Sequence, residues 1–213
     1  MKKIIAVALS LCIIGGALPI VGELVPDMAI TASAETTSGE CGENITWTLD
    51  DEGTLTISGT GAIFDYSIWD TQSPFSYNSD IKTVYISHGI TNIGKELFYE
   101  CRNITSVTMT DSVKTIGDGA FEYCENLTQI TLPDSIISIG SYAFRATKWL
   151  KNRQAENPLV IVNGILIDAE TCIGDVTIPN SVTSMSEGAF SHCENIKVYP
   201  KPWTKFCNHG QIK

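Results

Sequence analysis

Residues 104–126 read ITSVTMTDSVKTIGDGAFEYCEN, and the same pattern returns every 23 residues. Three further segments align with it without gaps: IKTVYISHGITNIGKELFYECRN at 81–103, LTQITLPDSIISIGSYAFRATKW at 127–149 and IGDVTIPNSVTSMSEGAFSHCEN at 173–195. Phenylalanine marks the period in one column, at positions Phe75, Phe98, Phe121, Phe144 and Phe190. A whole unit that repeats in this way predicts a solenoid, in which each coil buries its apolar edge only against its neighbours.

Each unit predicts the same local structures in the same order. An alternating apolar pair, such as Val107 and Met109, indicates a short strand with one face inward. A turn rich in Asp, Ser, Asn and Pro follows, and then a second short extended piece. The unit closes on a helical turn in which Ala120, Phe121 and Cys124 share one face. Stacked coils therefore place ladders of Ile, Val, Phe and Cys inside.

This pattern resembles the BspA-like class of bacterial leucine-rich repeats. The resemblance rests on the strand pairs, on the Pro-Asp-Ser turn at 133–135 and on the Gly-x-x-Ala-Phe-x-x-Cys run at 117–124. It covers residues 81–195, although unit 127–149 departs from it with Thr147 in the Cys column and Trp149 in the Asn column. The resemblance implies a right-handed leucine-rich-repeat coil, a secreted or surface-attached protein, no catalysis, and a role in adhesion and protein binding.

The first 34 residues have the features of a secretory signal. Lys2 and Lys3 precede an apolar run at 4–21, and Ala32-Ser33-Ala34 forms a cleavage site of small residues. An uncleaved membrane anchor is the alternative, but Pro and Gly residues interrupt the run. No later stretch is long and apolar enough to span a bilayer. We therefore expect an exported protein, secreted or held at the cell surface.

The rest of the chain divides around the repeats. Alternation at 45–49 and 55–57 about an acidic turn at 50–53 predicts a β-hairpin that caps the first coil. The expected segments are a hairpin cap and degenerate coil at 35–80, three regular repeats at 81–149, a hairpin-bearing coil at 150–172, a regular repeat at 173–195 and an irregular tail at 196–213.

The hairpin expected within 150–172 centres on Asn163-Gly164, which lies between two apolar runs and favours a type I′ turn. The segment is one period long and puts Ile167 in the Phe column. We therefore interpret it as a coil of the solenoid, and a domain boundary as the weaker alternative.

Charge restricts the class of partner. The chain has 14 basic and 24 acidic residues and a formal net charge of −10, and removal of residues 1–34 leaves that net charge unchanged. A strongly acidic protein is repelled by nucleic acid and by anionic membrane surfaces. We expect neither as a partner.

No group of residues indicates a catalytic or metal site, and no cofactor is predicted. The three histidines, His88, His192 and His209, lie in separate parts of the repeat and tail, without a nucleophile and carboxylate beside them. Cysteine and histidine near 192–193 and 207–209 lack the spacing of a zinc site. The acidic run at 50–52 is typical of a solvated hairpin turn.

The cysteines predict buried thiols. Cys101, Cys124 and Cys193 occupy the inward column, where free thiols acting as small apolar groups are favoured over a Cys101–Cys124 bond. Cys41, Cys172 and Cys207 fall outside the column, and their disulfide state is left open. Asparagines that precede the next coil, such as Asn103 and Asn126, are expected to bond backbone at the coil corner.

The outward residues of the main strands are the candidate binding surface. They form a flat, largely uncharged face, which β propensity alone also explains because threonine is a good exposed-strand residue. The outward set comprises Tyr85, Thr108, Thr131 and Thr177 in one column and Thr83, Ser106, Gln129 and Asp175 in the next.

The sequence thus favours a secreted, non-enzymatic repeat protein that binds an extracellular macromolecule through this strand face, with a protein partner implied by the resemblance. One alternative is a structural or targeting module of a larger extracellular assembly or enzyme. Another is a glycan-binding module, which is favoured if aromatics such as Trp47, Trp69, Tyr85 and Trp149 are exposed together.

The exported protein should begin at Glu35, because signal peptidase accepts the small side chains of Ala32-Ser33-Ala34. Intact-mass spectrometry of material recovered from the culture medium tests this. A secreted species that retains residues 1–34 would contradict it.

Overall fold

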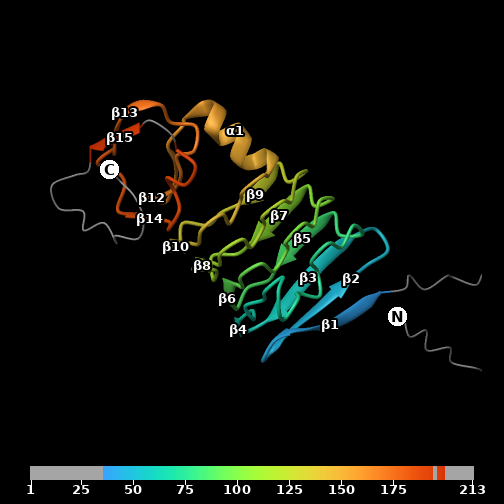
Figure 1. The fold of residues 1–213 in the computed structure, drawn as a ribbon. Coiled ribbons are helices and arrows are strands. Elements are labelled where there is room, and N and C mark those ends of the chain that lie inside the picture. Colours follow the sequence, from blue (N-terminus) through green and yellow to red (C-terminus); the bar gives the residue numbers. More distant parts are fainter. Residues whose placement is uncertain (1–35, 194–195, 200–213) are drawn as a thin grey trace, which may run out of the picture. The chain divides into compact units, whose positions relative to one another are not determined.

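The computed structural model describes residues 36–193 and 196–199, which fold as a β-solenoid (Figure 1). Its largest sheet has six strands in the order β1-β2-β3-β5-β7-β9. These are β1 (Thr37–Gly42), β2 (Ile45–Leu49), β3 (Thr54–Gly59), β5 (Thr83–Ile86), β7 (Ser106–Met109) and β9 (Gln129–Thr131). A second sheet has the order β10-β8-β6-β4 and runs along the same coils. It comprises β4 (Gly61–Ala62), β6 (Ile90–Ile93), β8 (Thr115–Ile116) and β10 (Ser138–Ile139).

The remaining elements follow the third regular repeat. Helix α1 (Lys148–Glu156) comes first. A three-stranded sheet then has the order β11-β12-β14, and a separate pair joins β13 to β15. Their bounds are β11 (Val160–Val162), β12 (Ile165–Asp168), β13 (Gly174–Thr177), β14 (Ser184–Met185) and β15 (Ile196–Tyr199).

Strands of successive coils pair in parallel, one period apart. Val84 of β5 is paired with Val107 of β7, which is paired with Ile130 of β9. The helical turns are joined in the same way, since Phe98 N donates to Ala120 O and Phe121 N to Ala143 O. Equivalent residues therefore stack directly, and the predicted leucine-rich-repeat solenoid is confirmed.

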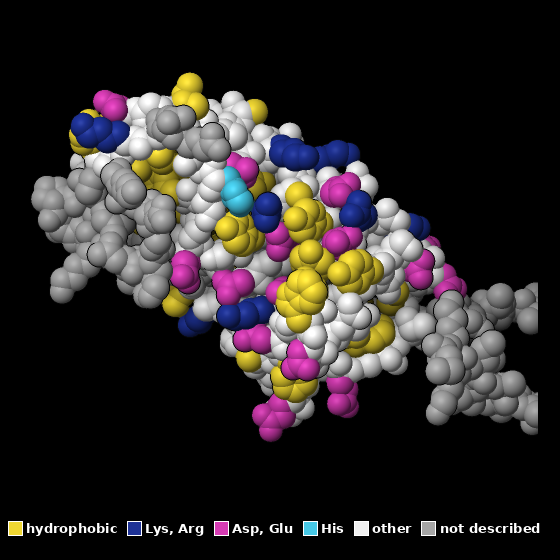
Figure 2. Space-filling view, in the orientation of Figure 1, with side chains coloured by type: hydrophobic (Ala, Val, Ile, Leu, Met, Phe, Trp, Pro, Cys, Tyr) yellow, Lys and Arg dark blue, Asp and Glu magenta, His cyan; other side chains and the backbone are white. Residues whose placement is uncertain are grey.

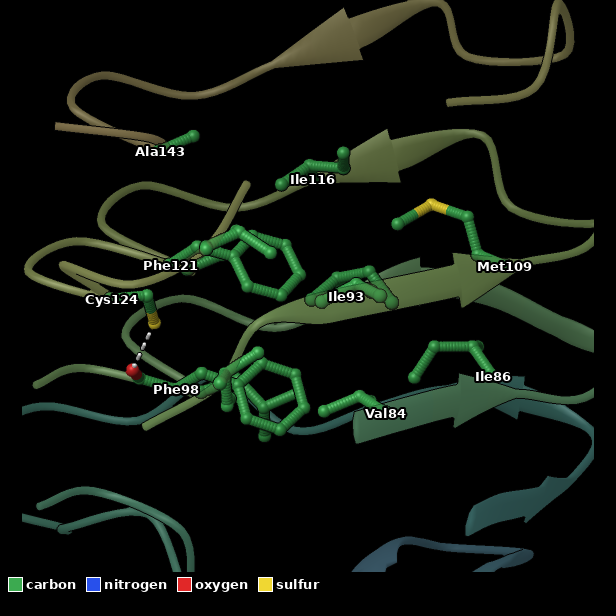
Figure 3. Packing of buried hydrophobic residues seen from close by; sticks show 14 of the residues in the cluster. Val84, Ile86, Ile93, Phe98, Met109, Ile116, Phe121, Cys124 and Ala143 are labelled. Atoms are coloured by element: carbon green, nitrogen blue, oxygen red, sulfur yellow. Dashed lines mark hydrogen bonds between the residues drawn. The ribbon is translucent and has the colours of Figure 1, made fainter. Parts of the chain in front are cut away.

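The phenylalanine column forms the centre of the core (Figure 3). The rings of Phe75, Phe98, Phe121 and Phe144 stack with centroids 5.4, 5.2 and 5.7 Å apart, and none of the four is more than 2% exposed. Cys124 lies beside this stack and its thiol donates to the carbonyl oxygen of Phe98. The ladder thus fills the interior and satisfies buried backbone groups.

The N-terminal segment extends the sheet before the first coil. Strands β2 and β3 pair antiparallel, and β3 pairs in parallel with β5, which sets Leu55 beside Val84. Leu55 and Ile57 are fully buried, and the Trp47 ring meets Phe75 edge-on at 5.2 Å. The apolar end of the phenylalanine ladder is therefore covered on this side.

Helix α1 interrupts the main sheet where the sequence departs from its repeat. Thr147, in the Cys column, is the N-cap residue, and its hydroxyl accepts from Leu150 N at 3.1 Å. Threonine suits this position because its oxygen satisfies a free amide of the first helical turn. Trp149 packs on Phe144 with centroids 4.7 Å apart and is 6% exposed. The helix thus takes the place of the next main strand after β9.

The prediction that Ile167 occupies the Phe column is wrong. Ala169 has that place, because its N–H donates to Ala189 O as Phe98 N does to Ala120 O. Cys193 Sγ likewise donates to Ala169 O, as Cys124 Sγ does to Phe98 O. Helix α1 and the β11–β12 hairpin together delay the helical turn by two residues. Cys172, which follows Ala169 by three residues, therefore belongs to the cysteine column, contrary to expectation.

The corner asparagines bond as predicted. Asn103 Nδ2 donates to Ser79 O at 2.7 Å and Asn126 Nδ2 to Arg102 O at 3.0 Å. The predicted signal at 1–34 and the tail with Cys207 and His209 lie outside the described residues, and those expectations remain predictions.

The ladder predicts a large difference between inward and outward aromatics. Phe121→Ala removes a fully buried ring between two stacked neighbours and should lower the free energy of unfolding by about 3–5 kcal/mol. Tyr85→Ala should cost much less, because Tyr85 is 43% exposed. Urea melts of the two variants compare them. Equal losses would contradict the inward and outward assignments.

Candidate interaction surface

The outer face of the six-stranded sheet gathers most of the predicted binding residues. Tyr85, Thr108 and Thr131 are paired in one row across β5, β7 and β9. Ser106 and Gln129 are paired in the row beside it. All five are exposed or half-buried, while the strand residues between them point inward. We call this surface the strand face.

The strand face is rich in hydroxyl groups and poor in charge. Ser106 Oγ lies 3.4 Å from Thr83 Oγ1, and Ser58 and Ser87 hydroxyls are 3.0 Å apart. Within the six strands the only charged residue is Glu40, near the edge in β1. A partner would therefore meet hydrogen-bonding groups whose desolvation costs less than that of charges.

Sequence reasoning missed the N-terminal half of this face. Thr56 of β3 is paired with Tyr85, and Thr48 of β2 is paired with Thr56, so the threonine row continues over the hairpin. Thr54 extends the second row, opposite Thr83. The signal was present, because Thr-x-Thr occurs at 46–48 and 54–56.

Thr177 is not part of the strand face. It lies in β13, which pairs with β15 and not with β9, and its partner in register is Tyr199. Asp175 lies in the same strand. The structure thus brings together five of the six predicted binding residues and separates the sixth, because α1 stands between the two groups of strands along the chain.

One pairing of histidine with carboxylate was also missed. His88 Nδ1 lies 3.5 Å from Asp111 Oδ1, in the turns of adjacent coils, and the two side chains are 78% and 85% exposed. The two residues are one period apart in the sequence, and this spacing could have indicated that they lie side by side. So exposed a pair is a weak surface interaction. Among the described residues no group of three or more His, Cys, Asp or Glu could hold a metal ion.

The buried thiols are held in their neutral form. Burial raises the pKa of Cys101 from its ordinary value of 9.0 to about 12, and that of Cys193 to about 11. Burial likewise raises the pKa of Cys124 well above the ordinary range. No disulfide joins cysteines within the described part of the chain. Because the thiolate is the reactive form, these cysteines are poor nucleophiles near neutral pH.

Comparison with known families gives the same assignment as the coil geometry. Residues 71–197 match six copies of the BspA-type leucine-rich repeat region. The chain belongs to this family. Leucine-rich repeats are in general a non-catalytic fold that serves protein interaction. In residues 36–193 and 196–199, no helix has the length and apolarity of a membrane span.

Solved structures of bacterial leucine-rich repeat proteins are similar. A leucine-rich repeat protein from Eubacterium ventriosum is 30% identical, with a TM-score of 0.55 over 79% of this chain and 45% of that protein. A leucine-rich cell surface protein from Faecalibacterium prausnitzii is 19% identical, with a TM-score of 0.33 over 79% of this chain and 55% of that one. The chain thus spans about half the length of these proteins. A comparison with curated protein sequences finds no match.

The raised thiol pKa values predict a loss of stability at alkaline pH. Above about 9 the unfolded cysteines lose their protons, while the folded ones keep them up to about 12, so the unfolded state binds fewer protons and stability falls as pH rises. The free energy of unfolding, measured by urea melts from pH 8 to 11, should fall. The fall should be shallower in a Cys101→Ala, Cys124→Ala double variant.

Alkylation gives an independent check of the same thiols. The native protein at pH 7.5 should react slowly with iodoacetamide. The unfolded, unreduced protein should react at Cys101, Cys124 and Cys193. Peptide mapping that finds Cys101 linked to Cys124 would refute the free-thiol assignment.

Proposed function

We propose that the protein is a secreted, non-enzymatic module that binds another extracellular protein through its strand face. The observation that carries this proposal is the continuous row that runs from Thr48 through Thr56, Tyr85 and Thr108 to Thr131. Family membership supports a protein-interaction role, and the predicted signal at 1–34 supports export.

The physical argument is preorganisation. The strand-face residues of β5 and β7 stand on strands with buried inward neighbours, since Val84 and Val107 are at most 1% exposed, while Ile130 of β9 is half-buried. Adjacent strands lie about 4.8 Å apart, so the outward side chains form a regular array. Because the backbone beneath is already ordered, this protein loses little conformational entropy when a partner binds there. A wide, flat and nearly uncharged surface is also suited to an extended contact.

A glycan-binding role has less support in the structure. The aromatic group that would favour it is not assembled, since Trp149 is 6% exposed and Trp47 packs against Phe75. Trp69 is 89% exposed. Tyr85 is the one aromatic side chain within the outward rows of the six-stranded sheet.

Paired arginines on the strand face test the proposal. A Thr108→Arg, Thr131→Arg variant places two long charged side chains on adjacent strands, where they should abolish binding by bulk and by desolvation cost. Binding is measured on an array of purified extracellular proteins beside an array of polysaccharides. Far-ultraviolet circular dichroism and the melting temperature should stay near those of the unmodified protein.

The matched control carries the same added charge elsewhere. Thr91→Arg with Ser138→Arg alters exposed residues of β6 and β10 in the second sheet, and should leave binding intact. Loss of binding in the control but not in the strand-face variant would place the contact on another surface. Binding to polysaccharides alone would replace the protein partner with a glycan.

A further inference from the structure

A row of aromatic side chains lies on the helical turns, away from the strand face. The rings of Tyr77, Tyr99 and Tyr123 come from three successive coils and meet edge to face, with centroids 5.8 and 5.6 Å apart. The Arg145 guanidinium continues the line, because it lies 5.9 Å from the Tyr123 centroid and 5.1 Å from that of Tyr142. We call these four tyrosines the tyrosine stripe.

The tyrosine stripe is accessible along its length. Tyr77 is 50% exposed and Tyr142 is 38% exposed, while Tyr99 and Tyr123 between them are half-buried. Figure 2 shows hydrophobic side chains gathered among acidic and basic ones on the face that it presents. Rigid, partly packed tyrosines lose little conformational entropy on binding and are enriched at protein interfaces.

The backbone beneath the stripe favours glycine over tyrosine. Tyr77, Tyr123 and Tyr142 have φ of 62°, 60° and 57°, in the left-handed region where a side chain costs free energy. One coil before Tyr142, the equivalent position is Gly119, with φ of 59°. The repeat imposes the same left-handed geometry on Glu100, one coil after Tyr77, so the backbone alone does not select tyrosine there.

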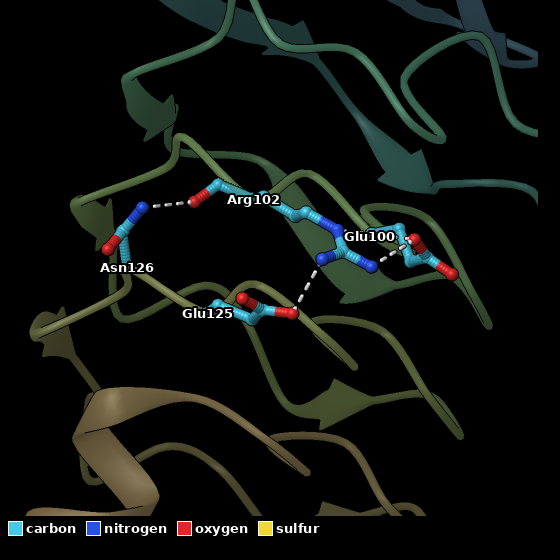
Figure 4. Close-up of polar contacts among 4 residues, drawn as sticks. All are labelled: Glu100, Arg102, Glu125 and Asn126. Carbon is cyan, nitrogen blue, oxygen red and sulfur yellow. Dashed lines mark hydrogen bonds and ion pairs between the residues drawn. The ribbon is translucent and has the colours of Figure 1, made fainter.

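The charges around the stripe show which partner it fits. The helical turns at 95–102 and 118–125 carry five carboxylates and two cations. Arg102 is held between Glu100 and Glu125, each at 2.8 Å (Figure 4). Glu96 accepts from the Ile68 amide at 2.6 Å and forms no ion pair among the described residues. The surface beside Tyr99 is therefore left with an acidic excess.

The protein's own Arg145 shows how this surface holds a cation. Its guanidinium contacts two tyrosine rings and lies 3.4 Å from Glu122 Oε1. Ring faces and a carboxylate together attract a guanidinium or ammonium group more strongly than either does alone. A second copy of this chain would bring the same acidic excess and a formal net charge of −10, so self-association is disfavoured.

We propose that the tyrosine stripe binds an arginine- or lysine-rich segment of another protein. The segment's cations lie over Tyr77 and Tyr99 and beside Tyr123, whose ring Arg145 already contacts. They pair with Glu96 and with the Glu100 carboxylate that Arg102 also contacts. This surface is independent of the strand face, and its partner does not have to be the same protein.

Replacing the strained tyrosines by glycine separates binding from folding. Tyr77→Gly with Tyr123→Gly relieves two left-handed residues and leaves the net charge unchanged, but it also removes the contacts of both rings with Tyr99, so the melting temperature is measured beside the affinity. The probe is a fluorescent ten-residue peptide of alternating Arg and Gly, followed by anisotropy. Loss of these ring contacts should raise its dissociation constant about tenfold. If this variant unfolds, Tyr77→Asn with Tyr123→Asn replaces it, because asparagine tolerates the left-handed region.

Matched variants and peptides distinguish the stripe from net charge. Tyr85→Ala removes a tyrosine from the strand face and should change the dissociation constant less than about twofold, since it removes no cation–π contact of the stripe. Glu96→Gln with Glu100→Gln should raise the dissociation constant of the peptide. The difference from the unmodified protein should become smaller at high salt. A Glu-Gly peptide of equal length should not bind. Equal affinity of the glycine variant and the unmodified protein, or no binding of the Arg-Gly peptide, would overturn the proposal.

Discussion

Backbone hydrogen bonds between successive coils hold equivalent residues in register, and the whole solenoid relies on them. They join Phe98 N to Ala120 O and set Val84 beside Val107, so whatever side chain a column carries is repeated along the stack. An inward column must then be apolar in every coil, and a flat phenylalanine ring stacks on itself with little void. The same stacking places outward residues of successive coils side by side, so that they form one continuous surface.

A break in one column changes the fold because the columns are coupled. Cys124 donates its thiol to Phe98 of the preceding coil, whereas Thr147 in the same column caps a helix instead. Helix α1 then replaces a main strand, and the buried residues separate into two clusters that divide between Ile165 and Leu166. The six-stranded sheet ends at β9, and the strand face ends with it.

Two surfaces of different chemistry follow from this architecture. The strand face offers hydroxyls on straight strands, with little charge. The tyrosine stripe lies on tight turns, where rings and carboxylates come close because successive turns are stacked. The interior between them contains thiols whose pKa is raised by burial, and in the described coils it supplies no reactive group.

The amino-acid sequence alone predicts the solenoid, its period, the inward columns and the outward rows of β5, β7 and β9, because a gapless repeat forces equivalent residues to stack. The slip in the repeat could be seen only in the folded molecule, because helix α1 and the β11–β12 hairpin together use two residues more than a regular coil, which puts Ala169 and not Ile167 in the Phe position. The three-dimensional arrangement also decides which columns lie on one surface. Thr56 joins the strand face and Thr177 leaves it, because strand pairing depends on which backbone edges are free after the chain has turned.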